Sequence, residues 1–414
     1  MPTNPAEYRP IPLRRDSQQW VFDWAIKQTG VVMHFQGDDR GPLPRTVKAH
    51  RMISKHLGLA ARRRERMAGE ELQAGHRETA LDLYFSAAAL YASAQHVIFE
   101  TNAEKEQLHG AALACYERVQ ACAPYEIRRL VADFEGGQVA GYLHIAPNQP
   151  SAPCVFFVPG CDMTKEQYPH PLFNHAAQRG MHILSFDGPG QGESNLRDIR
   201  LTADNYERAA SAMMDVLATQ PEVDSTKIAV YGLSFGSHWA TRVAAHDPRF
   251  AGLAAMWASF ADKRFLMELE SPRYKQLFAY LTRSADEDEL DAIVSDMRVD
   301  ELLGNIACPT LVTVGEFDPR APLEEIYRLF ALLNCPAELW VLADQHHKAS
   351  LVGSGNAPIW LAHAHWQAMD WLRDRLAGIP VSHPGETLYL NVPSGQSPYG
   401  QAVERKTWWY EDAE

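Results

Sequence analysis

Gly232-Leu-Ser-Phe-Gly236 is the stretch that decides the fold of this chain. A short apolar run with strand character, residues 227–231, comes directly before it, and a run rich in helix formers, residues 237–246, comes directly after. The pattern G-x-S-x-G between a strand and a helix is typical of a sharp turn that exposes the serine hydroxyl beyond the sheet. Glycines at the flanking positions let the strand and the helix pass closely, because no Cβ intervenes. We therefore predict that Ser234 is a nucleophile; a plain glycine-rich turn is the alternative.

The composition is that of a globular protein with a net negative charge. The chain has 414 residues, 46% of them hydrophobic, and a formal net charge of −13, which argues against nucleic acid or an anionic membrane as a partner. Its six cysteines show no C-x-x-C pair or metal-ligand spacing, so we interpret them as free thiols in a reducing compartment and expect no metal. The sequence also lacks an apolar signal region and any long apolar run, so we expect a cytoplasmic protein that acts on a small molecule.

The first part of the chain, residues 1–124, is predicted to be a helical region whose first 16 residues are loose. An all-helical stretch of this length cannot belong to an alternating α/β sheet, so we expect a cap region that packs over the mouth of the site. Within it, the basic run Arg62-Arg-Arg-Glu-Arg66 permits two interpretations, an anion site or a solvated helix face. The apolar periodicity predicts helices from residue 18, over 47–66, over 70–99 with a break at Gly75, and over 103–122.

From residue 125 the pattern changes to strands that alternate with helices, which predicts an α/β fold with a mainly parallel sheet. We expect a core over 125–380, a helical insert over about 262–305, and a tail over 381–414 that packs on the core or on a partner subunit. The predicted strands are 126–134 and 138–145, which form a hairpin, then 154–158, 182–186, 227–231, 253–257, 310–314 and 337–341, with a further strand-like run at 387–391. The predicted helices are 171–179, 203–219, 234–246, 323–333 and 359–376.

Candidate acid and base residues follow the last two predicted strands of the core. A serine nucleophile needs a histidine to take its proton and a carboxylate to orient that histidine, and in this type of chain both follow the serine in order. Asp318 comes shortly after one strand, and His346 and His347 come after the next. We predict Asp318 as the acid and one of the two histidines as the base. Glu316 and Asp262 are lesser candidates for the acid.

The developing negative charge on the substrate oxygen needs backbone N–H donors, which together form an oxyanion hole. Gly160 and Cys161 directly follow the strand 154–158, and Phe235 directly follows the candidate serine. We predict that the N–H of Cys161, or of Gly160, acts together with that of Phe235. Cys161 as a nucleophile is a weaker alternative, because no histidine is paired with it in the sequence.

Two motifs carry a resemblance to a known family: Val158-Pro-Gly-Cys-Asp-Met-Thr-Lys-Glu166 and Phe186-Asp-Gly-Pro-Gly-Gln-Gly-Glu-Ser194. With the serine motif, they resemble the α/β-hydrolase superfamily. Within it they are similar to a group that includes 2,6-dihydroxypseudooxynicotine hydrolase, fungal pigment polyketide-shortening hydrolases and fermentation-respiration-switch-like esterases. The resemblance covers residues 125–378 well and the helical region only in kind. The group has small residues where this chain has His238 and Trp239.

The resemblance implies the α/β-hydrolase fold and a triad of Ser234, Asp318 and His347, since the group keeps similar gaps between these positions. It also implies activity without a metal or organic cofactor, and often a homodimer. Either an ester or a C–C bond next to a stabilised carbanion would be cleaved, the latter in retro-Claisen fashion. Glu268 or Glu270 is a candidate proton donor for a carbanion-like leaving group, and solvated helix carboxylates are the alternative.

Aromatic residues of the insert and the cap could line a pocket for an aromatic or polyketide-like substrate, although core packing suits most of them equally. These residues are Trp24, Tyr84, Phe265, Tyr274, Phe278 and Tyr280. Two other functions use the same positions: an acyltransferase, in which an alcohol replaces water, and a binding protein on a hydrolase fold. Asp187, in the D-G-P-G loop, is interpreted as a turn former.

Overall fold

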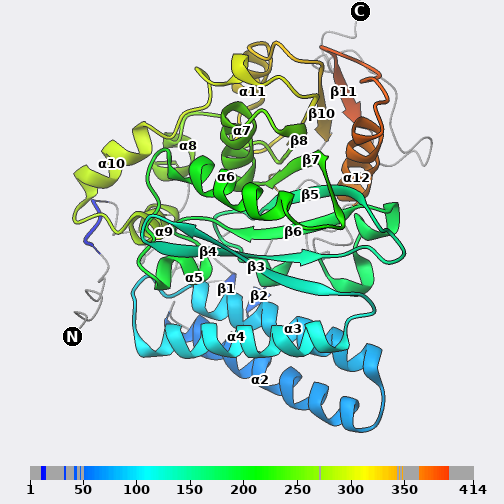
Figure 1. The fold of residues 1–414 in the computed structure, drawn as a ribbon. Coiled ribbons are helices and arrows are strands. Elements are labelled where there is room, and N and C mark those ends of the chain that lie inside the picture. The colour runs from blue at the N-terminus through cyan, green and yellow to red at the C-terminus, as the bar shows by residue number, and fades with distance from the viewer. Residues whose placement is uncertain are drawn as a thin grey trace, which may run out of the picture.

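A nine-stranded sheet occupies the centre of the protein in the computed structural model (Figure 1). The strand order is β11-β10-β9-β8-β7-β5-β6-β4-β3, and all neighbours are parallel except the pairs β3–β4 and β4–β6. The structure describes residues 11–14, 32–33, 42–43, 47, 51–269, 272–342, 345, 347 and 363–390. The strands of the sheet are β3 Ile127–Phe134, β4 Gly137–His144, β5 Ala152–Val158, β6 His182–Asp187, β7 Val223–Leu233, β8 Phe250–Met256, β9 Thr310–Gly315, β10 Ala337–Leu342 and β11 Thr387–Leu390. The prediction of a mainly parallel α/β sheet that opens with an antiparallel hairpin is confirmed.

Helices cover both faces of the sheet, because its buried strands are apolar on both sides. Strand β5 shows the alternation: Cys154, Phe156 and Val158 point into one core cluster, and Val155 and Phe157 point into the other. The first cluster is covered by α6 and α7, and the second by α12. The helices beyond the cap are α5 Gly192–Leu196, α6 Asn205–Ala218, α7 Phe235–His246, α8 Arg264–Met267, α9 Pro272–Thr282, α10 Glu287–Ser295, α11 Leu323–Phe330 and α12 His363–Leu376.

Three helices form a separate layer at the β3–β4 side of the molecule (Figure 1). They are α2 Arg51–Gln73, α3 Arg77–His96 and α4 Ala103–Cys122. Their core is rich in alanine, which lets the helices approach closely, and it joins the sheet through Ile127 and Tyr142. A short antiparallel pair, β1 Val32–Met33 and β2 Pro42–Leu43, precedes this layer.

Two sequence predictions about helices were wrong. The helix expected over 47–66 does not end near residue 66, because α2 runs on to Gln73; the break expected at Gly75 is present, with φ of 87° at that glycine and α3 beginning at Arg77. The expected helix 171–179 is two short 3₁₀ turns, Pro171–Phe173 and Ala177–Arg179. The side chains of His170 and Asn174 accept hydrogen bonds from the N–H groups of Leu172 and Ala177, so the backbone has local partners other than an α-helix.

The run 387–391 contributes a strand to the sheet, since β11 pairs in parallel with β10. The helix predicted from residue 18, with Trp24, and the tail beyond residue 390 lie outside the described residues. Among the residues that are described, no helix has both the length and the apolar character needed to cross a bilayer.

Candidate active site

Ser234 stands at a strained turn between β7 and α7. Its φ and ψ are 56° and −126°, a conformation that costs a non-glycine residue roughly 1–3 kcal/mol. The flanking glycines make the turn possible: a Cβ on Gly232 would lie 2.2 Å from the carbonyl oxygen of Gly236, and a Cβ on Gly236 would lie 2.3 Å from the carbonyl oxygen of Val158. The Ser234 N–H donates to the carbonyl of Met256 in β8 at 2.9 Å, which fixes the turn to the sheet.

A continuous chain of hydrogen bonds joins Ser234, His347 and Asp318. The Oγ of Ser234 lies 2.6 Å from Nε2 of His347, and Nδ1 of the same ring lies 2.6 Å from Oδ2 of Asp318. Asp318 and His347 are only 3% and 8% exposed, whereas Ser234 is half-buried. The arrangement has the geometry of a serine, a base and an orienting acid.

Asp318 is held as a carboxylate by its surroundings. Burial alone would raise its pKa, but the His347 imidazole and the backbone N–H of Arg320 hold the pKa below its usual value. Backbone hydrogen bonds tie the acid loop to the base loop, since the N–H of Phe317 donates to the carbonyl of Gln345 at 2.9 Å. The ring of Trp257 lies beside that of His347, with 6.1 Å between centroids. Sequence reasoning missed Trp257, which follows the end of β8 and so stands at the same sheet edge.

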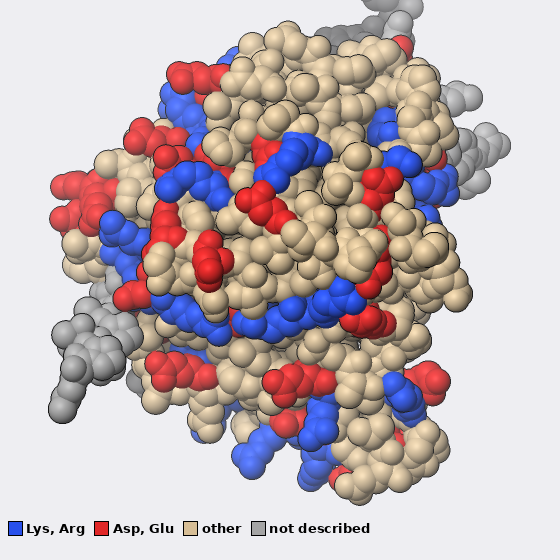
Figure 2. Space-filling view, viewed as in Figure 1, with Lys and Arg blue, Asp and Glu red and all other residues tan. Residues whose placement is uncertain are grey.

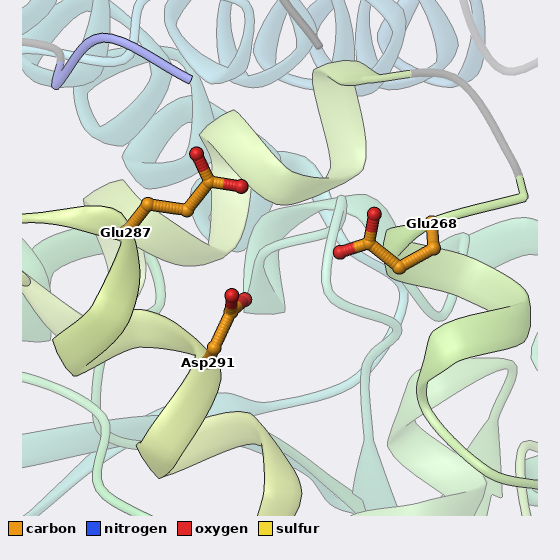
Figure 3. A group of neighbouring side chains, drawn as sticks. All are labelled: Glu268, Glu287 and Asp291. Carbon is orange, nitrogen blue, oxygen red and sulfur yellow. The ribbon is translucent and has the colours of Figure 1, made fainter. Parts of the chain in front are cut away.

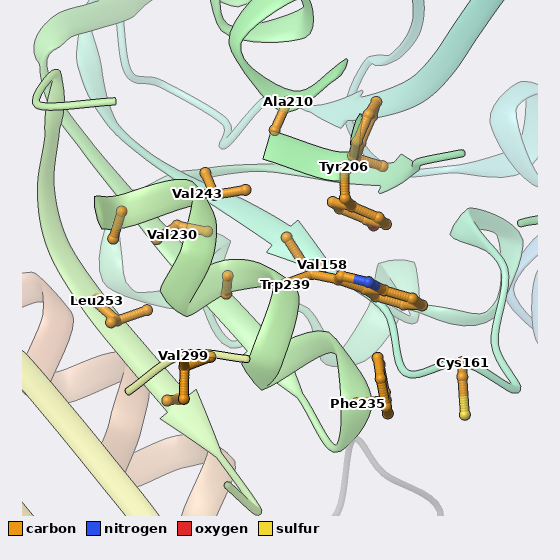
Figure 4. Packing of buried hydrophobic residues seen from close by; sticks show 14 of the residues in the cluster. Val158, Cys161, Tyr206, Ala210, Val230, Phe235, Trp239, Val243, Leu253 and Val299 are labelled. Atoms are coloured by element: carbon orange, nitrogen blue, oxygen red, sulfur yellow. The ribbon is translucent and has the colours of Figure 1, made fainter. Parts of the chain in front are cut away.

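The predicted oxyanion-hole residues lie around the serine. A Cβ on Gly160 would be 3.5 Å from the Cβ of Ser234, so the loop after β5 approaches the nucleophile closely. Phe235 is the first residue of α7, where backbone N–H groups have no partner within the helix. Cys161 is buried in the same core cluster as Phe235 (Figure 4).

Gln191 holds this loop in place, and sequence reasoning missed it although it lies in the Phe186–Ser194 motif. Its side-chain amide donates to the carbonyl of Gly160 at 2.9 Å and accepts from the hydroxyl of Tyr206 at 2.8 Å. Trp239 stacks on Tyr206 with 4.4 Å between ring centroids and 6° between planes (Figure 4). Trp239 stands where the similar group has a small residue. It is 2% exposed, so its large side chain fills the core behind the loop. The motif therefore serves to position the loop of Gly160.

His238 is enclosed next to the oxyanion loop. Its side chain is fully buried, its ring lies 5.1 Å from that of Phe235, and neither ring nitrogen has a hydrogen-bond partner within the described part of the chain. Burial, together with the charges of Lys263 and Arg242, keeps the pKa of His238 far below its usual value, so the ring is neutral.

The structure pairs Glu268 with Lys275, whose ammonium donates to its carboxylate, and Figure 3 shows Glu268 beside Glu287 and Asp291. The carboxylates of Glu268, Glu287 and Asp291 lie close enough together to hold a metal ion, but they converge on the Lys275 ammonium, which is 2.7 Å from Glu287 and 2.8 Å from Asp291. The ammonium group thus already supplies a positive charge at this position. The other possible residues, Glu270 and His346, lie outside the described residues.

Of the predicted aromatic lining, Phe278 lies nearest to the nucleophile turn. Its ring centroid is 4.6 Å from that of Phe235. Tyr274 and Tyr280 are buried on the same helix, α9, whereas Tyr84 belongs to the core of the helical layer. Phe265 is half-buried at a different cavity, of about 520 Å³, whose lining does not include Ser234, Asp318 or His347.

Comparisons with known proteins agree with this fold. The profile of the esterase FrsA-like family matches residues 64–266, and that of the prolyl oligopeptidase family matches residues 173–376. The 2,6-dihydropseudooxynicotine hydrolase of Paenarthrobacter nicotinovorans is 29% identical over 316 residues, covering 75% of this chain and 81% of that protein. The esterase FrsA of Yersinia enterocolitica is 25% identical over 350 residues, covering 78% of this chain and 75% of that protein.

The crystal structure of the 2,6-dihydroxy-pseudo-oxynicotine hydrolase superposes with a TM-score of 0.71 at 24% identity, covering 89% of this chain and 98% of that one. With the sheet topology, these matches place the chain in the α/β-hydrolase superfamily. It is a hydrolase of that class, similar to proteins that are named as a 2,6-dihydropseudooxynicotine hydrolase and as esterases.

Proposed function

We propose that this chain is a serine hydrolase that attacks the acyl or keto carbon of a small-to-medium, aromatic or polyketide-like substrate. The observation that carries the proposal is the hydrogen-bond chain from Ser234 through His347 to Asp318. Each of its three residues comes from a different part of the sequence, and a purely structural serine does not require this arrangement.

In the proposed reaction, His347 Nε2 takes the proton of Ser234 as Oγ bonds to the substrate carbon. The N–H groups of Phe235 and of Cys161 or Gly160 then stabilise the oxyanion, and Asp318 stabilises the imidazolium that has formed. His347 gives its proton to the leaving group as the bond from the carbonyl carbon breaks, leaving an acyl-enzyme. Water then adds to the acyl carbon as His347 takes its proton. The bond from that carbon to Ser234 Oγ breaks, His347 returns the proton to Oγ, and the acid is released.

The leaving group distinguishes the two reactions that this site supports. An ester loses an alkoxide, and a ketone loses a carbanion that an adjacent group must stabilise; in both, the leaving group receives its proton from His347. Glu268 pairs with Lys275, so its carboxylate does not serve as the proton donor in this proposal. The rings of Phe235, Phe278 and Trp257 lie near the serine and the base but are at most 4% exposed, so the aromatic substrate is proposed from the similarity to the relative named as a 2,6-dihydropseudooxynicotine hydrolase.

The test is covalent labelling with a serine-directed fluorophosphonate, read by intact-protein mass. Wild type should gain one adduct and Ser234→Ala none. Ser237→Ala is the matched control, because Ser237 lies one turn along on α7 and its hydroxyl only accepts from the N–H of Ser259; it should label like wild type. An adduct that persists in Ser234→Ala would sink the proposal.

The choice of base is tested by replacing each histidine with glutamine. His347→Gln should lower kcat/KM for an aryl ester by on the order of 10³-fold or more, and His346→Gln should change it far less. Equal losses in both variants would contradict the assignment of His347. An aryl ester and an aryl 1,3-diketone assayed side by side, with product analysis in water and with added alcohol, would identify the bond cleaved and the acceptor.

A further inference from the structure

A cleft of about 820 Å³ lies in the helical layer, away from the triad. Helix α2 forms one wall with Arg62, Arg63 and Arg66, and helix α4 forms the opposite wall with Arg118. Tyr84 of α3 lies between the walls. We call this site the arginine cleft. In Figure 2 basic side chains project from the lower helical layer, where α2 lies in Figure 1.

Three of these arginines have no carboxylate partner within the described part of the chain. Among the residues that the structure describes, no carboxylate lies within ion-pair distance of Arg62, Arg63 or Arg118. Most other arginines in the described ranges do have one, although the whole chain carries a net charge of −13. Examples are Arg129 with Glu193 at 2.7 Å, Arg242 with Glu207 at 2.6 Å and Arg249 with Asp247 at 2.6 Å.

The one carboxylate in the cleft is engaged elsewhere. Glu65 accepts a hydrogen bond from the hydroxyl of Tyr91 at 2.7 Å. Arg66 faces Glu70 at 3.6 Å, but both side chains are about two-thirds exposed or more, so this pair contributes little. The cleft therefore has a net positive charge.

The spacing on α2 includes like-charged pairs. Arg66 lies three residues after Arg63 and four after Arg62, so it repels both, whereas Glu65 lies three residues after Arg62 and Glu70 four after Arg66 and attract them. Each pair is worth a few tenths of a kcal/mol, so the repulsion is offset only in part. On α4 the neighbours of Arg118 at the i−4 and i+4 positions are Ala114 and Cys122, which offer no charge to it. A bound anion would relieve this repulsion.

Two buried side chains lie at the floor of the cleft. Tyr84 is 7% exposed and Cys115 is 1% exposed, whereas Leu59 and Ala114 at the border are exposed, Leu59 by 48%. The buried side chains exclude water from beneath the walls, which strengthens charge interactions there. The floor offers apolar surface to the organic part of a ligand. The guanidinium group binds phosphate oxygens in pairs, and two facing walls of guanidinium groups match oxygens that point in several directions, as in a phosphate chain.

We propose that the arginine cleft binds a small organic anion with two or more phosphate charges, such as a nucleoside diphosphate. The phosphates lie between Arg118 and the arginines of α2, and the organic part rests on the floor near Tyr84. The proposal is independent of the reaction at Ser234.

The experiment is isothermal titration calorimetry of the full chain at low ionic strength, with ADP and with inorganic pyrophosphate as probes. The test variant is Arg62→Gln/Arg63→Gln/Arg118→Gln. The control variant, Arg208→Gln/Arg328→Gln/Arg373→Gln, removes the same charge at exposed positions elsewhere, where side chains are 47%, 54% and 47% exposed. Circular dichroism and ester turnover without probe report that both variants are folded.

Both probes should bind wild type and the control variant, and the cleft variant should bind them about 100-fold more weakly or worse. Lysine at the same three positions keeps the charge but not the paired hydrogen bonds, so partial binding is expected. Tighter binding of ADP than of pyrophosphate supports a role for the floor, and equal affinities overturn that part of the proposal. Failure of both probes to bind wild type, or undiminished binding in the cleft variant, overturns the proposal. Binding only to phosphatidylserine vesicles would assign the cleft to a membrane surface and would also overturn it.

Discussion

Two buried charged clusters lie at the carboxyl ends of strands in the same sheet, and they differ in what their carboxylates face. Asp318, after β9, faces the imidazole of His347, which in turn faces the half-buried Ser234. Asp187, the last residue of β6, faces the ammonium of Lys165 at 3.0 Å, and both side chains are fully buried. Glu166 and Glu193 complete this second cluster around Lys165.

The comparison shows that burial of an aspartate does not by itself make a reactive site. In the first cluster the partner of the carboxylate can gain and lose a proton, and the chain of hydrogen bonds ends at a hydroxyl near the surface. In the second cluster three carboxylates surround one ammonium group. Burial alone would lower the pKa of Lys165, but the three carboxylates raise it well above its usual value, so its proton is fixed. The Lys165 cluster therefore holds the motif loops together.

The largest expected effect is a loss of activity that occurs when Asp318 is replaced but not when Asp187 is replaced. Asp318→Asn should lower kcat/KM for an aryl ester on the order of 10⁴-fold, because the amide cannot stabilise the imidazolium and favours the wrong tautomer of His347. The kcat/KM of Asp187→Asn should stay within about tenfold of wild type, since the carboxylate of Asp187 accepts hydrogen bonds from the backbone N–H and the ammonium of Lys165. Steady-state kinetics of both variants, with urea unfolding to confirm the fold, checks this. Comparable losses in the two variants would break the distinction between the clusters.

The three residues of the hydrogen-bond chain could be proposed from the sequence because each follows a recognisable strand. The G-x-S-x-G spacing located Ser234, and the strand at 310–314 located Asp318. The sequence alone could not choose between His346 and His347, because adjacent residues differ only in where their side chains point, which the packed loop decides. It also misread Asp187 as a turn former, since its partner Lys165 lies 22 residues earlier in the sequence and only the fold brings the two together.

The fold was predictable where periodicity was strong, as in β5 to β10 and in α4, which begins and ends at the expected residues. The prediction failed where side chains compete with the helix for the hydrogen bonds of the backbone. His170 and Asn174 do so over 171–179, and their hydrogen bonds to N–H groups could not be read from apolar spacing. Helix α2 runs past residue 70 to Gln73 and lies close to α3 there, since a Cβ added to Gly69 would be 3.6 Å from the hydroxyl of Tyr84; local sequence does not encode such an approach across helices.

The second prediction concerns stability at the Lys165 cluster. Lys165→Met should lower the free energy of unfolding by about 3–5 kcal/mol, because it leaves buried carboxylates without their cation. Lys227→Met is the control, since Lys227 is exposed and its contact with Asp224 is 3.5 Å long; it should change stability by less than about 0.5 kcal/mol. Urea unfolding at neutral pH measures both. A loss below about 1 kcal/mol in Lys165→Met would show that the cluster does not depend on its ammonium group.

The third and smallest expected effect is the change in the free energy of unfolding per unit of pH. It reports whether Asp187 is protonated in the folded protein. Burial raises the pKa of Asp187 to about 7, and Glu166 and Glu193 add to this, while Lys165 opposes it. Between the ordinary aspartate pKa and pH 7 the folded protein therefore retains a proton that the unfolded chain loses. In that window stability falls as pH rises, by up to about 1.4 kcal/mol per pH unit.

Asp187→Asn cannot ionise and serves as the reference, because the other titrating groups are common to both proteins. The unfolding free energy of wild type, measured relative to that of Asp187→Asn, should decline between pH 5 and pH 7 and level off above. If the difference instead grows as pH rises, Asp187 is ionised throughout and Lys165 outweighs burial. Each cluster would then contain an ionised aspartate. The reactive cluster would differ from the Lys165 cluster only in that its aspartate faces a histidine, His347, which can exchange its proton.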